Sequence, residues 1–290
     1  MLFNELTFAP FFLVVFLLCY ITNRFNQLKL RNTLLLIASY YFYAYFSVTF
    51  LITLVGVTLI NYLASVMLFK QKRKWVVSSV VFLSLLPLIG YKYTSFLLEH
   101  ILMIHHAEWS HWVMPVGISF FTFQALTYTI DIYRDKITER SSLLDYALFV
   151  SFFPTILSGP IARARYLLPQ LSAKTNMNHA GLTSGFQLFL WGLFKKIVIA
   201  DRMNVYTGSV FSTPDFYTGN TNLLAIALYS IQLYCDFSGY SDMAIGVARM
   251  LGFKIRANFL FPFFSTSLRS FWRKWHISLT SWFTEYLYIA

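Results

Sequence analysis

The stretch FAPFFLVVFLLCYI at residues 8–21 contains no charged side chain. Near-continuous apolar runs also occupy residues 33–69, 76–98 and 222–235. A helix needs about 20 apolar residues to cross the hydrocarbon core of a bilayer, so several crossings are available. Residues 8–21 follow no basic segment and precede no small-residue cleavage site, which indicates a retained span rather than a signal peptide. The chain is therefore predicted to be an all-α polytopic membrane protein surrounded by the lipid bilayer.

The composition agrees with this prediction. Of the 290 residues, 57% are hydrophobic and 12% are charged, against about 25% charged in a soluble domain. The formal net charge of +11 would suit a nucleic-acid partner only if a soluble body carried a basic face. The sequence contains no soluble segment of that kind, so nucleic acid is excluded as a partner.

Loops and helix-breaking residues mark the expected elements. Residues 146–158 are apolar but too short to cross, and they run into SGPIARARYLLPQL (158–171), where glycine and proline break a helix. We interpret this segment as re-entrant or interfacial. Irregular backbone at membrane depth is tolerated only where it is buried in protein or lines a cavity, so an internal cavity is predicted. The expected spans are 7–23, 33–46, 49–69, 76–98 and 183–200, with further apolar stretches at 114–133 and 222–251 and a polar loop at 203–221.

The charges of the loops predict an orientation, because Lys and Arg accumulate in cytoplasmic loops. Basic residues follow the first and third spans, namely Arg24, Lys29, Arg31, Lys70, Lys72, Arg73 and Lys74. The loop after the fourth span has no Lys or Arg and contains Glu99, His100, His105, His106, Glu108 and His111. All three loops agree with an N-terminus outside the cell. The four histidines could bind a metal weakly, but a solvated loop is favoured, and neither a metal site nor a bound cofactor is expected.

The segment YCDFSGYSDMAIG (234–246) places polar side chains inside an apolar run. Its polar and small residues are Asp236, Ser238, Gly239, Tyr240, Ser241, Asp242 and Gly246. A charge at the centre of a lone span costs about 2.5–3.5 kcal/mol, so these side chains are expected to face protein or water. One interpretation is that Asp236 or Asp242 pairs with a buried arginine, such as Arg249 or Arg269. The other is that the two carboxylates shape a reaction chamber. The two interpretations are compatible. Gly239 and Gly246 allow either close approach of another helix or a local break in their own helix.

The segment RSFWRKWH (269–276) sets cations and a histidine among tryptophans. On a helix, Arg269, Trp272, Arg273 and His276 share a face, and Trp275 lies about a quarter turn away. One interpretation is an interfacial anchor, since tryptophan and arginine favour membrane interfaces. The other is a site where an uncharged His276 takes a proton from a hydroxyl. The cations would then hold an anionic donor or, alternatively, lower the pKa of the histidine.

Four stretches taken together closely resemble the membrane-bound O-acyltransferase family, and in particular its branch that acetylates alginate. They are MPVGISFFTFQALTYTIDIYR (114–134), FFPTILSGPIARA (152–164), YCDFSGYSDMAIGVARMLGF (234–253) and FLFPFFSTSLRSFWRKWHISLTSWF (259–283). The similarity covers nearly the whole chain in the same order. It implies a ring of transmembrane and re-entrant helices around a central funnel, in a multi-pass protein of the cell inner membrane.

The resemblance also implies a reaction. A cytoplasmic thioester, acetyl-CoA or an acyl carrier, would donate an acetyl group to hydroxyls of an exported polysaccharide such as alginate, with periplasmic partner proteins assisting. His276 matches the histidine of the family's WxxWH motif and is the expected catalytic residue. The expected chamber lining is Asp236, Ser238, Tyr240, Asp242, Arg269, Trp272, Arg273 and Trp275.

In that family a second histidine follows on a later helix. We therefore expect residues 1–290 to form a single membrane domain that lacks its C-terminal helices and is inactive alone. Two alternatives stay open. A transporter or channel would use intramembrane charges for passage, although the sequence has no internal repeat of the kind many transporters carry. An inactive fragment could act as a scaffold.

Overall fold

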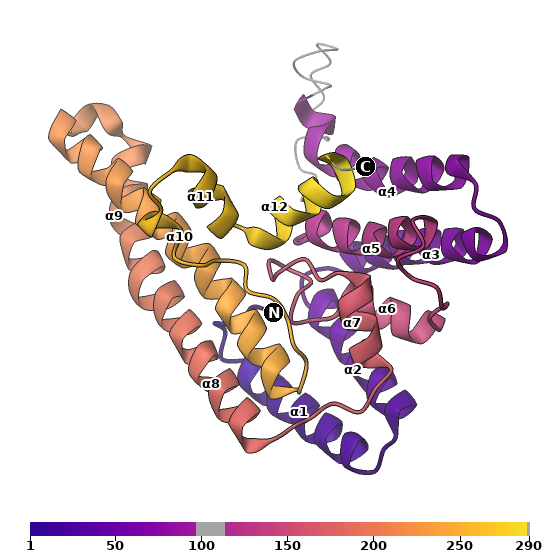
Figure 1. Cartoon of the computed structure of the whole chain (residues 1–290). Coiled ribbons are helices and arrows are strands. Elements are labelled where there is room, and N and C mark those ends of the chain that lie inside the picture. Colours follow the sequence, from indigo (N-terminus) through magenta and orange to yellow (C-terminus); the bar gives the residue numbers. More distant parts are fainter. Residues whose placement is uncertain (97–113, 289–290) are drawn as a thin grey trace. The chain divides into compact units, whose positions relative to one another are not determined.

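The computed structural model describes residues 1–96 and 114–288, and within these ranges all regular structure is helical (Figure 1). The histidine loop predicted at residues 99–111 lies outside the described residues. The longer helices are α1 (Phe8–Arg24), α2 (Leu28–Ala44), α3 (Val48–Lys70), α4 (Lys74–Phe96), α5 (Ile118–Tyr133), α8 (His179–Phe194), α9 (Asp201–Ser212) and α10 (Gly219–Met250). The shorter elements are α6 (Leu143–Ser151), α7 (Ala164–Leu171), η3 (Lys195–Ala200), η4 (Pro214–Phe216), η5 (Pro262–Phe264), α11 (Leu268–Lys274), α12 (Ile277–Phe283) and η6 (Thr284–Tyr288).

Three helices of the described chain are long and apolar enough to cross a membrane. They are Val48–Lys70, Lys74–Thr94 and the continuous helix His179–Ser212, which joins α8, η3 and α9. Phe8–Arg24 is a shorter apolar helix. These elements confirm the predicted all-α polytopic membrane class.

The predicted polar loop at 203–221 is wrong over its first half, because α9 continues the helix to Ser212. Its polar side chains find partners on α10. The Thr207 hydroxyl donates to Gln232 Oε1 at 2.5 Å, and Gln232 Nε2 donates to Asn204 Oδ1 at 3.0 Å. These cross-helix bonds explain why a polar sequence remains helical here.

The chain divides into two compact units, which are described separately below. Unit 1 contains residues 1–17, 158–160 and 175–284. Unit 2 contains residues 18–157, 161–174 and 285–290.

In unit 2, a buried polar bridge joins α3, α4 and α5. Asn61 Nδ2 donates to Ser84 Oγ at 2.8 Å, and Thr129 Oγ1 donates to Asn61 Oδ1 at 3.0 Å. All three side chains are fully buried. Between apolar helices in a bilayer, such bonds contribute about 0.6–2 kcal/mol each and fix which helix faces meet.

Polar side chains of unit 2 also satisfy the irregular backbone that follows α6. That helix ends at Ser151, so the apolar piece is too short to cross, as predicted. Phe153 N–H donates to Ser39 Oγ at 3.1 Å, and Ala162 N–H donates to Gln124 Oε1 at 3.2 Å. Both amides are thereby satisfied inside protein, which is the condition for irregular backbone at membrane depth.

In unit 1, glycines let α8 and α10 lie directly against each other (Figure 1). A Cβ built on Gly192 would lie 2.4 Å from the Gly239 carbonyl oxygen, and one on Gly246 would lie 2.5 Å from that of Gly185. Gly185 faces Gly246, and seven residues further along α8 Gly192 faces Gly239, which is seven residues earlier on α10. The two helices are therefore antiparallel. The close packing predicted for Gly239 and Gly246 is therefore confirmed.

This crossing predicts a stability effect. Gly192→Ala should lower the free energy of unfolding by about 1–3 kcal/mol, since the methyl group must push two backbones apart. The matched control is Gly208→Ala on α9, where an added Cβ meets nothing within 4 Å. Thermal unfolding of both variants in detergent tests this, and equal stability of the two would contradict the packing account.

Candidate active site

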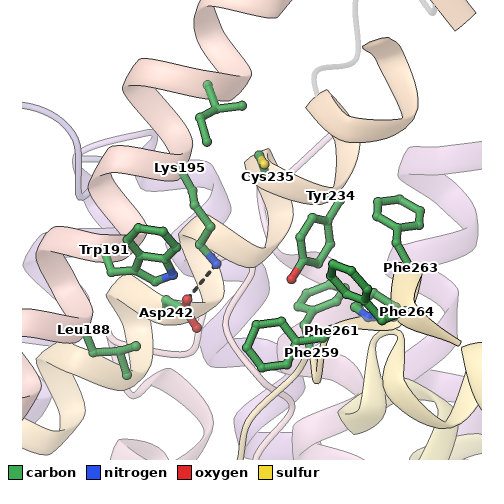
Figure 2. Close-up of a pocket in the computed structure, with 12 residues that line it drawn as sticks. Leu188, Trp191, Lys195, Tyr234, Cys235, Asp242, Phe259, Phe261, Phe263 and Phe264 are labelled. Atoms are coloured by element: carbon green, nitrogen blue, oxygen red, sulfur yellow. Dashed lines mark hydrogen bonds and ion pairs between the residues drawn. The ribbon is translucent and has the colours of Figure 1, made fainter. Parts of the chain in front are cut away.

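Unit 1 contains a cavity of about 440 Å³ beside the α8–α10 crossing (Figure 2). Aromatic side chains form much of its wall, and one lysine and one aspartate supply its charges. The lining residues are Leu188, Trp191, Lys195, Ile199, Tyr234, Cys235, Asp242, Phe259, Phe261, Pro262, Phe263 and Phe264. Volume and lining are those of a small-molecule site, which is mostly apolar with a few placed polar groups.

The charges of the cavity form a buried ion pair. Lys195 Nζ lies 2.6 Å from Asp242 Oδ2 and donates to Ser238 Oγ at 2.9 Å. The lysine side chain is 8% exposed and that of Asp242 is 25% exposed. The contact with Asp242 is the dashed line in Figure 2. Because each charge has a partner, the pair can persist among apolar side chains.

A second ion pair lies next to the first. Lys196 Nζ is 2.7 Å from Asp236 Oδ1 and 2.8 Å from Asp201 Oδ1. Residues 195–200 form a π-helical turn, in which residues five apart come together, as Lys196 and Asp201 do. Such turns occur frequently at functional sites.

The predicted arginine partners of the two α10 carboxylates are therefore wrong. The ion-pair partners are Lys195 and Lys196, because the antiparallel crossing sets these lysines opposite residues 236–242. Arg249 is exposed near the end of α10. The sequence places the two lysines near the end of a predicted span but gives no indication of which helix faces them.

His276 does not continue the helix that precedes it. Helix α11 ends at Lys274, α12 begins at Ile277, and His276 between them has the left-handed backbone angles φ 44° and ψ 53°. The shared helical face predicted for Arg269, Trp272, Arg273 and His276 is therefore wrong. The three other residues lie on α11 and are exposed, Trp272 by 55%.

The imidazole of His276 instead lies next to an aromatic residue of the cavity wall. Its ring centroid is 4.6 Å from that of Phe237 and 6.4 Å from that of Phe259, which lines the cavity. Burial lowers the pKa of His276 from 6.5 to about 4. The ring is therefore neutral at pH 7, the state in which it can accept a proton.

Two other predicted site residues, Trp275 and Tyr240, contact different groups of aromatic side chains. Trp275 packs against the cavity residue Phe259, with ring centroids 5.1 Å apart, and stacks on Phe271 at 5.5 Å. Tyr240 turns away toward the N-terminus and stacks on Phe3 at 4.8 Å. Of the predicted site residues, Asp242 lines the cavity, Ser238 bonds to the cavity residue Lys195, and Trp275 and His276 contact the cavity residue Phe259. Asp236 belongs to the second ion pair, and Tyr240, Arg269, Trp272 and Arg273 lie elsewhere.

Three residues at this site are absent from the sequence-based prediction. Lys195 supplies the cation, Phe259 lines the cavity and contacts the His276 ring, and Asn258 holds the turn that carries His276. A lysine within an apolar run signals a buried partner, so Lys195 was detectable in principle. Phe259 and Asn258 carry no local signal. Within the described ranges, no group of three or more His, Cys, Asp or Glu side chains is arranged to hold a metal.

Comparison with known proteins adds the family. A sequence model of the membrane-bound O-acyltransferase family matches residues 35–290. Over its whole length the chain is 38% identical to the probable alginate O-acetylase AlgI of Pseudomonas aeruginosa and covers 57% of that protein. It is 35% identical to the peptidoglycan O-acetyltransferase of Helicobacter pylori, again over its whole length and 61% of the relative.

A more distant similarity joins 76% of this chain to 55% of the teichoic acid D-alanyltransferase of Bacillus subtilis, at 32% identity. In each of these comparisons the chain spans only part of the relative's length, 57% for the alginate O-acetylase and 61% for the peptidoglycan O-acetyltransferase.

Proposed function

Because the chain belongs to the membrane-bound O-acyltransferase family, we propose that it acts in transfer of an acetyl group from a cytoplasmic thioester to hydroxyls of an exported polysaccharide. Alginate is the acceptor that the similarity to alginate O-acetylases favours. The observation that carries the proposal is a neutral, partly buried histidine of the WxxWH motif that contacts Phe259 in the wall of an aromatic cavity.

The proposed chemistry is a direct transfer. The imidazole of His276 accepts the proton of the sugar hydroxyl, and the hydroxyl oxygen attacks the thioester carbonyl carbon. The tetrahedral intermediate then expels the thiolate as its carbon–sulfur bond breaks. The thiolate takes the proton from the imidazolium, so the products are an acetyl ester and a free thiol. Donors beside the cavity stabilise the oxyanion, and Lys195 is the charged donor at its wall.

We further propose an orientation that delivers donor and acceptor from opposite sides. An outside N-terminus in the cell inner membrane places the loops after α1 and α3 in the cytoplasm. The segment between α5 and α8 then lies on the cytoplasmic side too, and it is also basic. Its cations are Arg134, Lys136, Arg140, Arg163, Arg165 and Lys174. A funnel within a ring of helices would join the two sides, with acetyl-CoA or an acyl carrier as donor and periplasmic proteins guiding the polysaccharide.

An exchange of genes tests the function. The open reading frame that includes residues 1–290, extended in frame as far as it is open, replaces the alginate O-acetylase of an alginate-producing host. Acetate esters on the purified polysaccharide are measured by proton NMR, with the host's own enzyme as positive control. Restored acetylation is the expected result. Membrane-inserted protein without acetate esters would contradict the proposed acceptor, and membrane vesicles with labelled acetyl-CoA or acetylated carrier then distinguish the donors.

The low pKa of His276 predicts the pH dependence of transfer. A base must be deprotonated, so the rate falls as the pH drops through its pKa and is constant above it. With a pKa of about 4, kcat/KM in vesicles should be constant from about pH 8 to about pH 5. An acid limb centred at the ordinary histidine pKa of 6.5 would contradict this environment for the base.

A further inference from the structure

The backbone at His276 needs support from outside its own helix. A non-glycine residue with φ of 44° occupies the left-handed region, which is disfavoured because its Cβ crowds the following carbonyl oxygen. Such a conformation persists only where surrounding contacts hold it, and residues of this kind cluster at functional sites. The question is which contacts hold this one.

Asn258 supplies those contacts. Its side chain is buried, and its Oδ1 accepts from the Ser278 amide at 3.2 Å and from the Ser278 hydroxyl at 2.8 Å. Its backbone carbonyl accepts from the Ile277 N–H at 2.8 Å. One residue thus binds both residues that follow His276.

The other end of the same side chain is fixed to α10. Asn258 Nδ2 donates to Ser241 Oγ at 3.2 Å, and Ser241 is the neighbour of the cavity residue Asp242. Asn258 therefore links the turn that carries the histidine to the helix that carries the ion pair. Each of its three side-chain bonds is made to a buried partner.

A second backbone bond fixes the chain before His276. Leu260 N–H donates to the Lys274 carbonyl at 3.0 Å. Residues 258–260 therefore run along residues 274–277 and are bonded to them on both sides of His276. Phe259 lies between the two bonded positions and stacks on the imidazole with an interplanar angle of 20°.

We propose that Asn258 is a positioning residue for acyl transfer, which holds the His276 imidazole against Phe237 and the cavity residue Phe259. The proposal rests on the proposed function. Asn258 acts through the histidine and is not assigned a contact with substrate. A group misplaced by about 1 Å can cost about 10²-fold in rate, so such a residue has a measurable effect on kcat.

Kinetics of single variants give the first readout. Asn258→Ala should lower kcat by about 10- to 100-fold and change KM by less than about threefold, because substrate binding does not depend on the direction of the imidazole. Ser278→Ala removes one of the bonds and should have a smaller effect in the same direction. Asn220→Ala, at an exposed asparagine near the start of α10, is the matched control and should leave kcat unchanged.

A double-mutant cycle separates positioning from a general structural role. In a His276→Ala background, adding Asn258→Ala should lower the residual rate by less than about twofold, since the group to be positioned is gone. A structural role would give the same loss in both backgrounds. Either that additive loss, or a kcat of Asn258→Ala within about twofold of the unsubstituted protein, overturns the proposal.

Chemical modification tests the positioning without relying on activity. Diethyl pyrocarbonate modifies neutral imidazoles, and mass spectrometry gives the rate at His276 relative to the exposed His179. Asn258→Ala should raise the relative rate at His276 about tenfold, because the released turn opens more often. Equal relative rates in folded protein with and without the substitution overturn the positioning role. All these variants are made in the extended open reading frame described above, and absence of acetyl transfer by its unsubstituted product contradicts the proposed function instead.

Discussion

His276→Ala is expected to reduce acetyl transfer by about 10²- to 10⁴-fold, the range that a positioned general base contributes. The imidazole is the group beside the cavity wall that burial keeps neutral at pH 7. Alanine cannot accept the hydroxyl proton, so attack on the thioester would depend on water. The measurement is transfer of labelled acetyl to polysaccharide by membrane vesicles that contain equal amounts of inserted protein.

The matched control is His179→Ala, which removes an exposed histidine at the start of α8 and should leave the rate unchanged. The ratio of the two rates therefore isolates the contribution of the partly buried His276 ring. Equal rates for His276→Ala and His179→Ala would remove His276 from the chemistry while leaving membership of the family intact.

Lys195→Met should destabilise the protein by about 3–5 kcal/mol, the cost of leaving one charge of a buried pair without its partner. The charge left behind is Asp242, whose carboxylate lies 2.6 Å from Lys195 Nζ. Asp242→Leu should destabilise the protein in the same way, because it leaves the Lys195 charge without its carboxylate partner. Thermal unfolding in detergent measures both, against Lys174→Met at an exposed position.

The double variant Lys195→Met/Asp242→Leu should recover much of the stability lost in either single variant, because it removes both charges together. Its acetyl transfer should nevertheless stay low, since the charged donor at the cavity wall is absent. Single variants as stable as Lys174→Met, or a double variant less stable than both, would contradict the buried ion pair.

The fold class could be predicted because the bilayer restricts the choice. Apolar runs with few charges can only become helices that satisfy their own backbone, and α3, α4 and α8–α9 are such helices. The end of α9 could not be predicted, since it depends on bonds from Asn204 and Thr207 to Gln232, 25 to 28 residues further along the chain.

Candidate site residues could be selected where the signal is local. Polar residues in an apolar segment stand out, and Ser238, Asp242 and His276 were selected as candidates in this way. The direction of His276 was not predictable, because a single left-handed residue breaks the helical spacing and Asn258, which holds that residue, lies 18 positions earlier. Tyr240 has the same local signal as Ser238 yet stacks on Phe3, a contact that only the folded chain defines.

The central claim is that the aromatic cavity beside His276 holds a substrate of acyl transfer. Phe264→Cys places a thiol on its wall, at a side chain that is 83% exposed, and Leu268→Cys places one on α11 at 79% exposed, outside the lining. Both are made with Cys19→Ser and Cys235→Ser, and maleimide labelling rates are measured with and without acetyl donor and polysaccharide. Saturating substrates should slow labelling at position 264 by at least about fivefold and leave position 268 unchanged. Unchanged labelling at position 264 in vesicles that are transferring acetyl groups would contradict the account.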